Sequence, residues 1–134
     1  MTGQLEISVI LPAPPQTVYA DWLNSEVHSA FTGSPAHIHA AIGGMFSAWD
    51  GYIEGKTLEL DEGVRIKQSW RTSDFPLEAG DSLIEVILDP VMHGDIAATH
   101  LTIRHTKLPP GSEKDYERGW QEYYFQPMLA YYNP

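Results

Sequence analysis

The sequence contains no cysteine and few basic residues: 8 Lys and Arg stand against 18 Asp and Glu, a formal net charge of −10. Without cysteine, disulfides, zinc–cysteine sites and thiol catalysis are all excluded. The excess of acidic residues disfavours binding to nucleic-acid phosphates and to anionic membrane surfaces, because like charges repel. We therefore expect neither nucleic acid nor a membrane among the partners.

Long hydrophobic runs and catalytic signatures are also missing. No stretch is long enough to span a bilayer, and a strand pattern that begins near Leu5 leaves no room for a cleavable signal peptide. The expected location is therefore the cytoplasm. There is no P-loop, nucleophile-elbow sequence or dinucleotide-binding fingerprint, and no carboxylate pair in a catalytic pattern. We predict no catalytic residue, no cofactor and no metal site.

Aromatic residues, in contrast, are well represented. The 134 residues, 43% of them hydrophobic, fit a single domain spanning residues 1–134. Aromatics make up 11%, including 4 Trp and 7 Tyr. Such large side chains suit either a sizeable core or the walls of a ligand cavity.

The first third of the chain has the pattern of one strand and two short helices. Apolar residues alternate from Leu5 to Leu11, which predicts a half-buried strand. Prolines from Pro12 onward end the strand and can begin a helix. Asn24 is expected to cap a second short helix, which Gly33 ends.

A β-hairpin is predicted around Asp50-Gly51, a dipeptide typical of a tight two-residue turn. Further along this strand the apolar residues shift to the alternate set of positions, which indicates a β-bulge near Lys56-Thr57. An earlier strand should place Ile38, Ala40 and Ile42 on its inner face. The predicted cross-strand pairs of the hairpin are Ala48 with Ile53, Ser47 with Glu54 and Phe46 with Gly55.

The remaining strands and a C-terminal helix complete the predicted fold. Alternation indicates strands over residues 64–71, 84–88 and 99–105, with a loop from Asp89 to Asp95. The last helix contains Pro127, which should kink it because a backbone donor is lost there. A run of strands with helices at both ends predicts an α+β fold with an antiparallel sheet.

Several motifs occur together in the order typical of one known family. They are Pro14-Pro15 before Val18-Tyr19-Ala20, Gly43-Gly44-Met45-Phe46, Asp50-Gly51-Tyr52-Ile53-Glu54-Gly55-Lys56, Gln68-Ser69-Trp70-Arg71, His105-Thr106-Lys107-Leu108-Pro109 and Gly119-Trp120. On these residues the chain resembles the activator of heat-shock protein 90 ATPase homologue family, of the C-terminal-domain type. That family belongs to the START-like, or SRPBCC, superfamily, and the segment from Glu26 through Gly33 is similar to a bacterial branch of it.

The resemblance implies a helix-grip (START-like, Bet v-type) fold, in which a curved antiparallel sheet wraps around a long C-terminal helix. Between sheet and helix the superfamily commonly encloses a cavity for an apolar or amphipathic small molecule. The side chains expected to point into this space are Phe46, Gln68, Trp70, Ile84, Val86, Leu101, Ile103, His105, Trp120, Tyr124 and Met128. A filled core is the alternative, in which His105 would be a buried neutral histidine with hydrogen-bond partners.

Two further pairs of residues are candidates for contacts outside that cavity. Trp49 and Tyr52 flank the hairpin turn on the predicted outer face, where they could anchor a partner protein or simply stack across the strands. His37 and His39 share a strand face that should point to solvent, which argues against a metal site.

Three functions follow from these expectations. The leading hypothesis is a non-enzymatic domain that binds a hydrophobic small molecule. The second is a co-chaperone-like interaction module for a heat-shock protein 90, with a role in the stress response. The third is a cyclase or hydrolase that uses His105, Gln68 and Tyr124.

Overall fold

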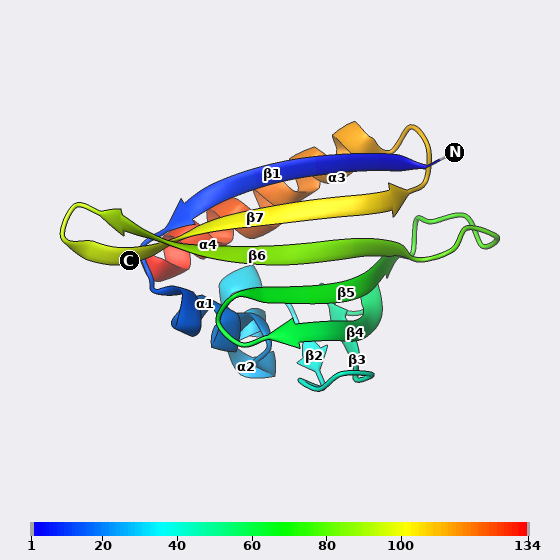
Figure 1. Ribbon diagram of the computed structural model, residues 1–134. Coiled ribbons are helices and arrows are strands. Elements are labelled where there is room, and N and C mark those ends of the chain that lie inside the picture. Colours follow the sequence, from blue (N-terminus) through cyan, green and yellow to red (C-terminus); the bar gives the residue numbers. More distant parts are fainter. Residues whose placement is uncertain (1, 134) are drawn as a thin grey trace.

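The computed structural model describes residues 2–133 as a seven-stranded antiparallel sheet with a C-terminal helix running across one face (Figure 1). The strand order is β1-β7-β6-β5-β4-β3-β2. The strands are β1 Gly3–Leu11, β2 His37–Ile38, β3 Met45–Ala48, β4 Ile53–Asp61, β5 Arg65–Thr72, β6 Ser82–His93 and β7 Ile96–Leu108. The helices are α1 Pro15–Trp22, α2 Ser25–Thr32, α3 Glu113–Trp120, the π-helical turn η1 Gln121–Phe125 and α4 Gln126–Tyr132. The predicted α+β class is confirmed.

The strand and the two short helices predicted at the start of the chain are present. Pro15 is the first residue of α1, where a missing N–H costs nothing. The Asn24 side chain accepts a 3.0 Å hydrogen bond from the backbone N–H of Val27 and caps α2. Gly33 ends α2 with φ of 77°, a left-handed conformation that glycine adopts without strain.

The β3–β4 hairpin has the predicted register, but its turn is longer than expected. Ala48 pairs with Ile53, so four residues rather than two form the connection. Trp49, Asp50 and Gly51 all have positive φ, at 54°, 56° and 86°. The bulge on β4 lies between Thr57 and Glu59, one residue beyond its predicted place.

Three predicted inward positions are wrong because they lie outside the strands, in turns. The strand after α2 ends at Ile38, and backbone hydrogen bonds from Ala41 to His39 and from Gly44 to Ala41 form a tight turn. Ala40 is therefore exposed, and Ile42 is 69% exposed. Val64, at the start of the strand predicted over 64–71, likewise lies in a turn and is exposed.

The predicted loop from Asp89 to Asp95 is instead the end of a long β6–β7 hairpin, which projects beyond the other strands (Figure 1). The loop was predicted because Pro90 lacks the backbone N–H that strand pairing uses. Leu88 directs its N–H to the carbonyl of Val64 on the β5 side, and Pro90, two residues on, has the same orientation. Because β5–β6 pairing ends at Arg65 and Ile87, the donor that Pro90 lacks would have met no strand.

The core lies between the inner face of the sheet and the helices. Ile66, Ile84, Val86, Leu101 and Ile103 are completely buried there. The outer face carries ion pairs that link neighbouring strands. Among the described helices, none combines the length and hydrophobicity that a transmembrane span requires.

The C-terminal helix contains a π-helical turn immediately before Pro127. The N–H of Gln126 donates to the carbonyl of Gln121, five residues back, instead of four. Pro127 then stands in the first turn of α4, where its missing donor is least costly. The irregularity that proline imposes on the helix thus takes the form of a π-bulge.

Candidate ligand-binding groove

A groove with a volume of about 660 Å³ lies where α3 and η1 face the β3–β4 turn and the end of β5. Ligand pockets are commonly of this size. The lining residues are Trp49, Tyr52, Ile53, Trp70, Asp74, Ser112, Asp115, Tyr116, Gly119, Trp120, Tyr123 and Tyr124. Seven of these twelve are aromatic, two are carboxylates and none is basic.

The aromatic side chains of the groove support one another by edge-to-face and tilted contacts. Trp70 packs at 89° against Tyr116, with 5.4 Å between ring centroids, and at 5.6 Å against Trp120. Trp49 and Tyr123 meet at 5.5 Å from opposite sides, one from the turn and one from η1. Such pairs hold rings in defined positions, so the walls of the groove are preformed.

Two tyrosine hydroxyls near the rim have fixed polar partners. Tyr52 donates a 2.7 Å hydrogen bond to a carboxylate oxygen of Asp74. The hydroxyl of Tyr116 lies 2.7 Å from that of Thr72. Burial, and then the bond to Asp74, raises the pKa of Tyr52 to about 12, so this phenol is neutral at physiological pH.

The indole nitrogen of Trp49 is buried without a hydrogen-bond partner within residues 2–133. An unsatisfied buried donor costs about 1–3 kcal/mol. Proteins keep few such groups, and those they keep often lie at functional sites. The indole N–H of Trp49 is therefore a buried donor whose hydrogen-bonding capacity is unused among these residues.

His105 points inward, as predicted, and is fully buried behind the groove. The N–H of Trp120 donates to its Nδ1 at 3.1 Å, so the proton resides on Nε2, which lies 2.8 Å from Ser82 Oγ. Ser82 in turn donates to the carbonyl of Trp70. Burial lowers the pKa of His105 to about 3, which keeps the ring neutral.

A second buried histidine, His28 on α2, was not anticipated as an important residue. Its Nδ1 lies 2.9 Å from the carbonyl of Trp22 and its Nε2 lies 2.9 Å from Tyr124 Oη. Because a carbonyl only accepts, Nδ1 carries the proton and Tyr124 donates to Nε2. Burial lowers the pKa of His28 to about 4 despite the bond to Trp22. Its position three residues before the buried Phe31 was the available sequence signal.

The structure divides the predicted cavity residues into two groups. Trp70, Trp120 and Tyr124 line the groove. The others are buried and do not line it: Phe46, Gln68, Ile84, Val86, Leu101, Ile103, His105 and Met128. Within this group Gln68 accepts from Trp22 Nε1 at 3.3 Å and donates to Thr57 at 3.2 Å.

The predicted outer-face position of Trp49 and Tyr52 is wrong, because both side chains line the groove. Their alternation along the strands would place them outside. The left-handed backbone at Trp49 and Asp50 breaks that alternation and turns the side chains toward η1 and α3. His37 and His39 are exposed, as predicted.

One protein-family model, described as "Activator of Hsp90 ATPase homolog 1-like protein", matches residues 12–132. The chain belongs to this family. The human protein "Activator of 90 kDa heat shock protein ATPase homolog 1" is 29% identical over 112 residues, which are 84% of this chain and 32% of the relative. An uncharacterised protein of Schizosaccharomyces pombe is 26% identical over 129 residues, 95% of this chain and 36% of the relative. The chain thus spans about a third of the length of these relatives.

Solved structures share the fold. An Hsp90 activator from Plasmodium falciparum matches with a TM-score of 0.85 at 21% identity, covering 96% of this chain and 94% of that one. A protein from Chromobacterium violaceum matches with a TM-score of 0.76 at 25% identity, covering 98% and 97%. CalU16 from Micromonospora echinospora matches with a TM-score of 0.77 at 20% identity, covering 98% and 76%. The predicted family and helix-grip fold are confirmed.

Proposed function

We propose that this chain is a non-enzymatic, cytoplasmic binding module that holds an amphipathic small molecule in the aromatic groove. The observation that carries the proposal is the set of seven aromatic side chains around about 660 Å³ of space. Binding sites are usually mostly apolar, with a few polar groups that orient the ligand. The hydroxyls of Tyr52 and Tyr116, two residues of the lining, are polar groups suited to that role.

The residues named for an enzymatic alternative have other partners. His105, Gln68 and Tyr124 are hydrogen-bonded to Trp120, Trp22 and His28, respectively. A general base works best when its pKa lies near the operating pH, whereas burial lowers that of His105 to about 3. These contacts favour a structural role for the three residues and support binding over catalysis.

Gly119 provides a direct test, because it lines the groove and an added Cβ there meets no atom within 4 Å. Gly119→Leu should fill the space and weaken ligand binding at least tenfold. Gly119→Ala is the matched control. It should keep binding and stabilise α3 by roughly 0.5–1 kcal/mol, since glycine is unfavourable inside a helix.

The experiment begins with a panel of aromatic and amphipathic metabolites, screened by thermal shift and then by titration calorimetry with wild-type protein. The strongest binder is titrated into both Gly119 variants, each checked for folding by circular dichroism. The proposal is wrong if no compound binds the wild type, or if Gly119→Leu binds as tightly as Gly119→Ala.

The family membership favours a second candidate, a co-chaperone for a heat-shock protein 90 in the stress response. Relatives carry names that describe them as activators of the Hsp90 ATPase. The measurement is the ATP hydrolysis rate of a purified heat-shock protein 90 as this protein is added in excess. An unchanged rate would exclude activation, and a loss of activation in Gly119→Leu alone would place the contact at the groove.

A further inference from the structure

We infer that the ligand of the groove is an organic cation, a quaternary or alkylated ammonium group attached to an apolar body. This inference rests on the proposed function and specifies its ligand class. Faces of Trp and Tyr rings attract cations through the ring quadrupole, and several such faces together bind quaternary ammonium groups. The groove combines seven such rings with two carboxylates and no competing basic residue in its lining.

Asp74 is the first of the two carboxylates. It has no ion-pair partner among the described residues and accepts its one side-chain hydrogen bond from Tyr52, at 2.7 Å. Its negative charge is therefore uncompensated by protein beside an aromatic wall. Burial raises the pKa of both Tyr52 and Tyr116, and the negative charge of Asp74 raises it further in each case.

Asp115 is the second carboxylate, in the first turn of α3. Among the described residues its ion-pair partner is Arg118, with 3.9 Å between the charged atoms. The two side chains are 81% and 69% exposed, and pairs of this kind contribute little. Arg118 can therefore move away when a cation enters the groove.

The arginine that follows the lining residue Trp70 in the sequence is already paired outside the groove. Arg71, next to Trp70, pairs with Asp81 at 2.9 Å and donates to the carbonyl of Ala79. Its guanidinium lies 5.5 Å from the centroid of the Phe75 ring. The charge of Arg71 is thus neutralised beside the groove and does not oppose a bound cation.

A matched pair of esters tests the charge directly. Benzoylcholine carries an aromatic body and a trimethylammonium group, and 3,3-dimethylbutyl benzoate has the same shape with carbon in place of the charged nitrogen. Binding is followed by quenching of tryptophan fluorescence, because Trp49, Trp70 and Trp120 line the groove. We expect the cation to bind about tenfold more tightly, the ratio that a preference of about 1.4 kcal/mol produces.

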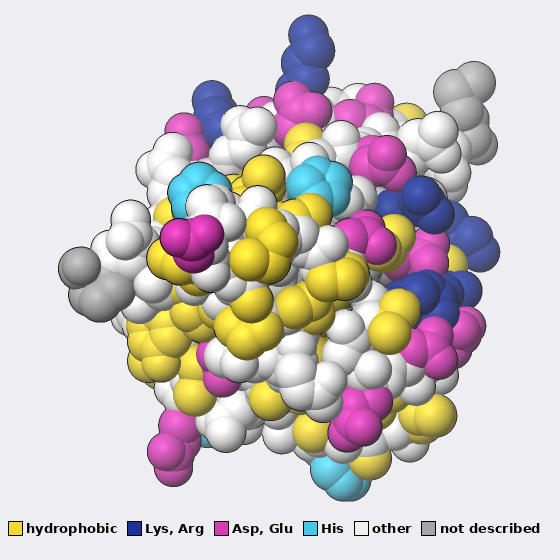
Figure 2. Space-filling model, turned by 60° about the vertical axis from the view of Figure 1, so that its left-hand side comes forward, with side chains coloured by type: hydrophobic (Ala, Val, Ile, Leu, Met, Phe, Trp, Pro, Cys, Tyr) yellow, Lys and Arg dark blue, Asp and Glu magenta, His cyan; other side chains and the backbone are white. Residues whose placement is uncertain are grey.

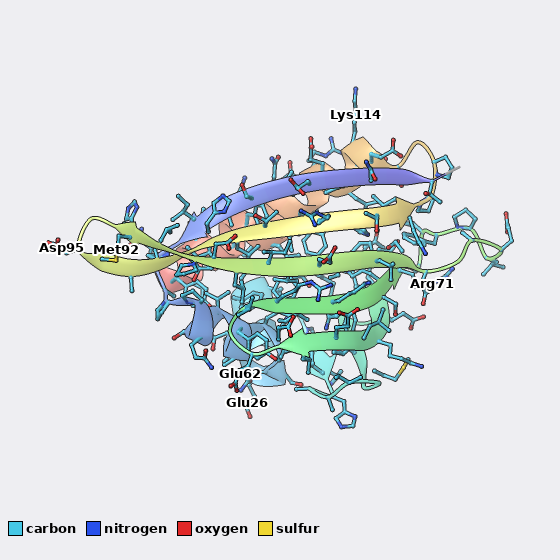
Figure 3. The ribbon with its side chains drawn as sticks, in the orientation of Figure 1. Glu26, Glu62, Arg71, Met92, Asp95 and Lys114 are labelled. Atoms are coloured by element: carbon cyan, nitrogen blue, oxygen red, sulfur yellow. The ribbon has the colours of Figure 1, made fainter. Side chains whose placement is uncertain are left out.

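Charge-removing variants identify the source of that preference. Asp74→Asn with Asp115→Asn should reduce the preference for benzoylcholine to less than threefold while leaving the neutral ester unaffected. The control, Glu26→Gln with Asp95→Asn, removes the same charge from two positions outside the lining of the groove. Asp95 lies at the opposite end of the molecule from Arg71, and Glu26 lies on α2 at the lower edge (Figure 3). The control should retain the full preference.

The possible outcomes separate this inference from the proposed function. Equal binding of both esters would overturn the cation preference and leave the hydrophobic site in place. An unchanged preference in the double Asp variant would also overturn it. If neither ester binds at its limit of solubility but the metabolite panel yields another ligand, the inference of a cationic ligand is wrong and the proposed function stands. If no compound of the panel binds either, the inference and the proposed function are both wrong.

Discussion

Two buried histidines are each fixed in one neutral tautomer by their partners. His105 accepts the Trp120 N–H, and His28 donates to the carbonyl of Trp22. Protonation would place two donors against each other at His105 Nδ1, because the indole N–H of Trp120 can only donate. At His28 Nε2 it would force the Tyr124 hydroxyl to turn from donor to acceptor. The fold therefore resists protonation at both sites.

This resistance predicts loss of stability in mild acid. Burial lowers the pKa of His28 to about 4 and that of His105 to about 3, from an ordinary value of 6.5. The unfolded chain therefore takes up protons below pH about 6.5 that the fold does not, and stability falls from there toward pH 3–4. At pH 5 each histidine should account for about 2 kcal/mol of that loss.

Urea unfolding at pH 7.5 and pH 5 measures the loss. His28→Asn should be less stable at pH 7.5 but should lose less on acidification than the wild type, because one titrating group is gone. His93→Asn, at an exposed position, serves as the control and should follow the wild-type profile. If the unfolding free energy falls by the same amount between pH 7.5 and pH 5 in His28→Asn and in wild type, His28 does not contribute to the acid sensitivity.

Substitution of Trp49 and of Trp120 should differ in its cost to stability. Trp49→Phe removes an indole N–H that has no acceptor, so its cost should stay within about 1 kcal/mol. Trp120→Phe deprives the buried His105 Nδ1 of its donor and leaves a cavity, and should cost about 2–4 kcal/mol. Denaturant unfolding of the two variants compares them, and similar losses of stability would contradict this prediction.

The short helix α2 ends where Gly33 adopts a left-handed backbone. Ordinary residues are strained in this conformation by about 1–2 kcal/mol. An added Cβ would meet no atom within 4 Å at Gly33 or at Gly80, but only Gly33 has positive φ. Comparison of the two positions therefore isolates the effect of backbone strain, because an added Cβ crowds no neighbour at either one.

Gly33→Ala should therefore destabilise the protein by about 1 kcal/mol. Gly80→Ala, in the loop before β6, should be neutral or stabilise the fold by up to about 1 kcal/mol, because it restricts the unfolded chain. Thermal unfolding distinguishes the two. A loss at Gly80 equal to that at Gly33 would mean that the φ value is not responsible.

The tip of the projecting β6–β7 hairpin is exposed on the surface. Met92 and Ile96 near its tip are exposed, and Figure 2 shows hydrophobic side chains gathered across this end of the molecule. Pro90 removes a donor from the free edge, a recognised means of discouraging strand pairing between copies. The same residue misled the sequence-based prediction of a loop.

Across the whole molecule, the outer face of the sheet is held by a chain of ion pairs. Arg104 pairs with Glu6 at 2.9 Å and lies 3.9 Å from Glu85, while Arg65 pairs with Glu85 at 2.7 Å and with Glu59 at 2.9 Å. The pairs connect β1, β7, β6, β5 and β4. Networks of this kind contribute more than isolated surface pairs.

Arg65→Met should consequently lower stability in low salt, and the difference from wild type should shrink in 1 M NaCl. At that ionic strength charges are screened beyond about 3 Å. Lys114→Met, at an exposed site on α3, is the matched control and should have a smaller effect (Figure 3). Urea unfolding at both salt concentrations is the measurement, and a difference independent of salt would point to packing of the Arg65 stem instead.

Local patterns in the sequence were sufficient to predict which faces of β1, β5 and β7 point inward, the pairing of Ala48 with Ile53, and the cap at Asn24. Alternation and capping are properties of neighbouring residues, so they can be read without a structure. The motifs likewise led to the correct family and fold.

The location of open space depends instead on how distant segments meet. Periodicity shows where a side chain points but not whether another residue fills the space in front of it, and the core behind Ile84 and Leu101 is filled. The groove exists because a left-handed turn at Trp49 brings this residue against Tyr123, more than seventy positions later in the printed sequence. His28 and Tyr124 meet in the same way, across helices whose contact no local pattern encodes.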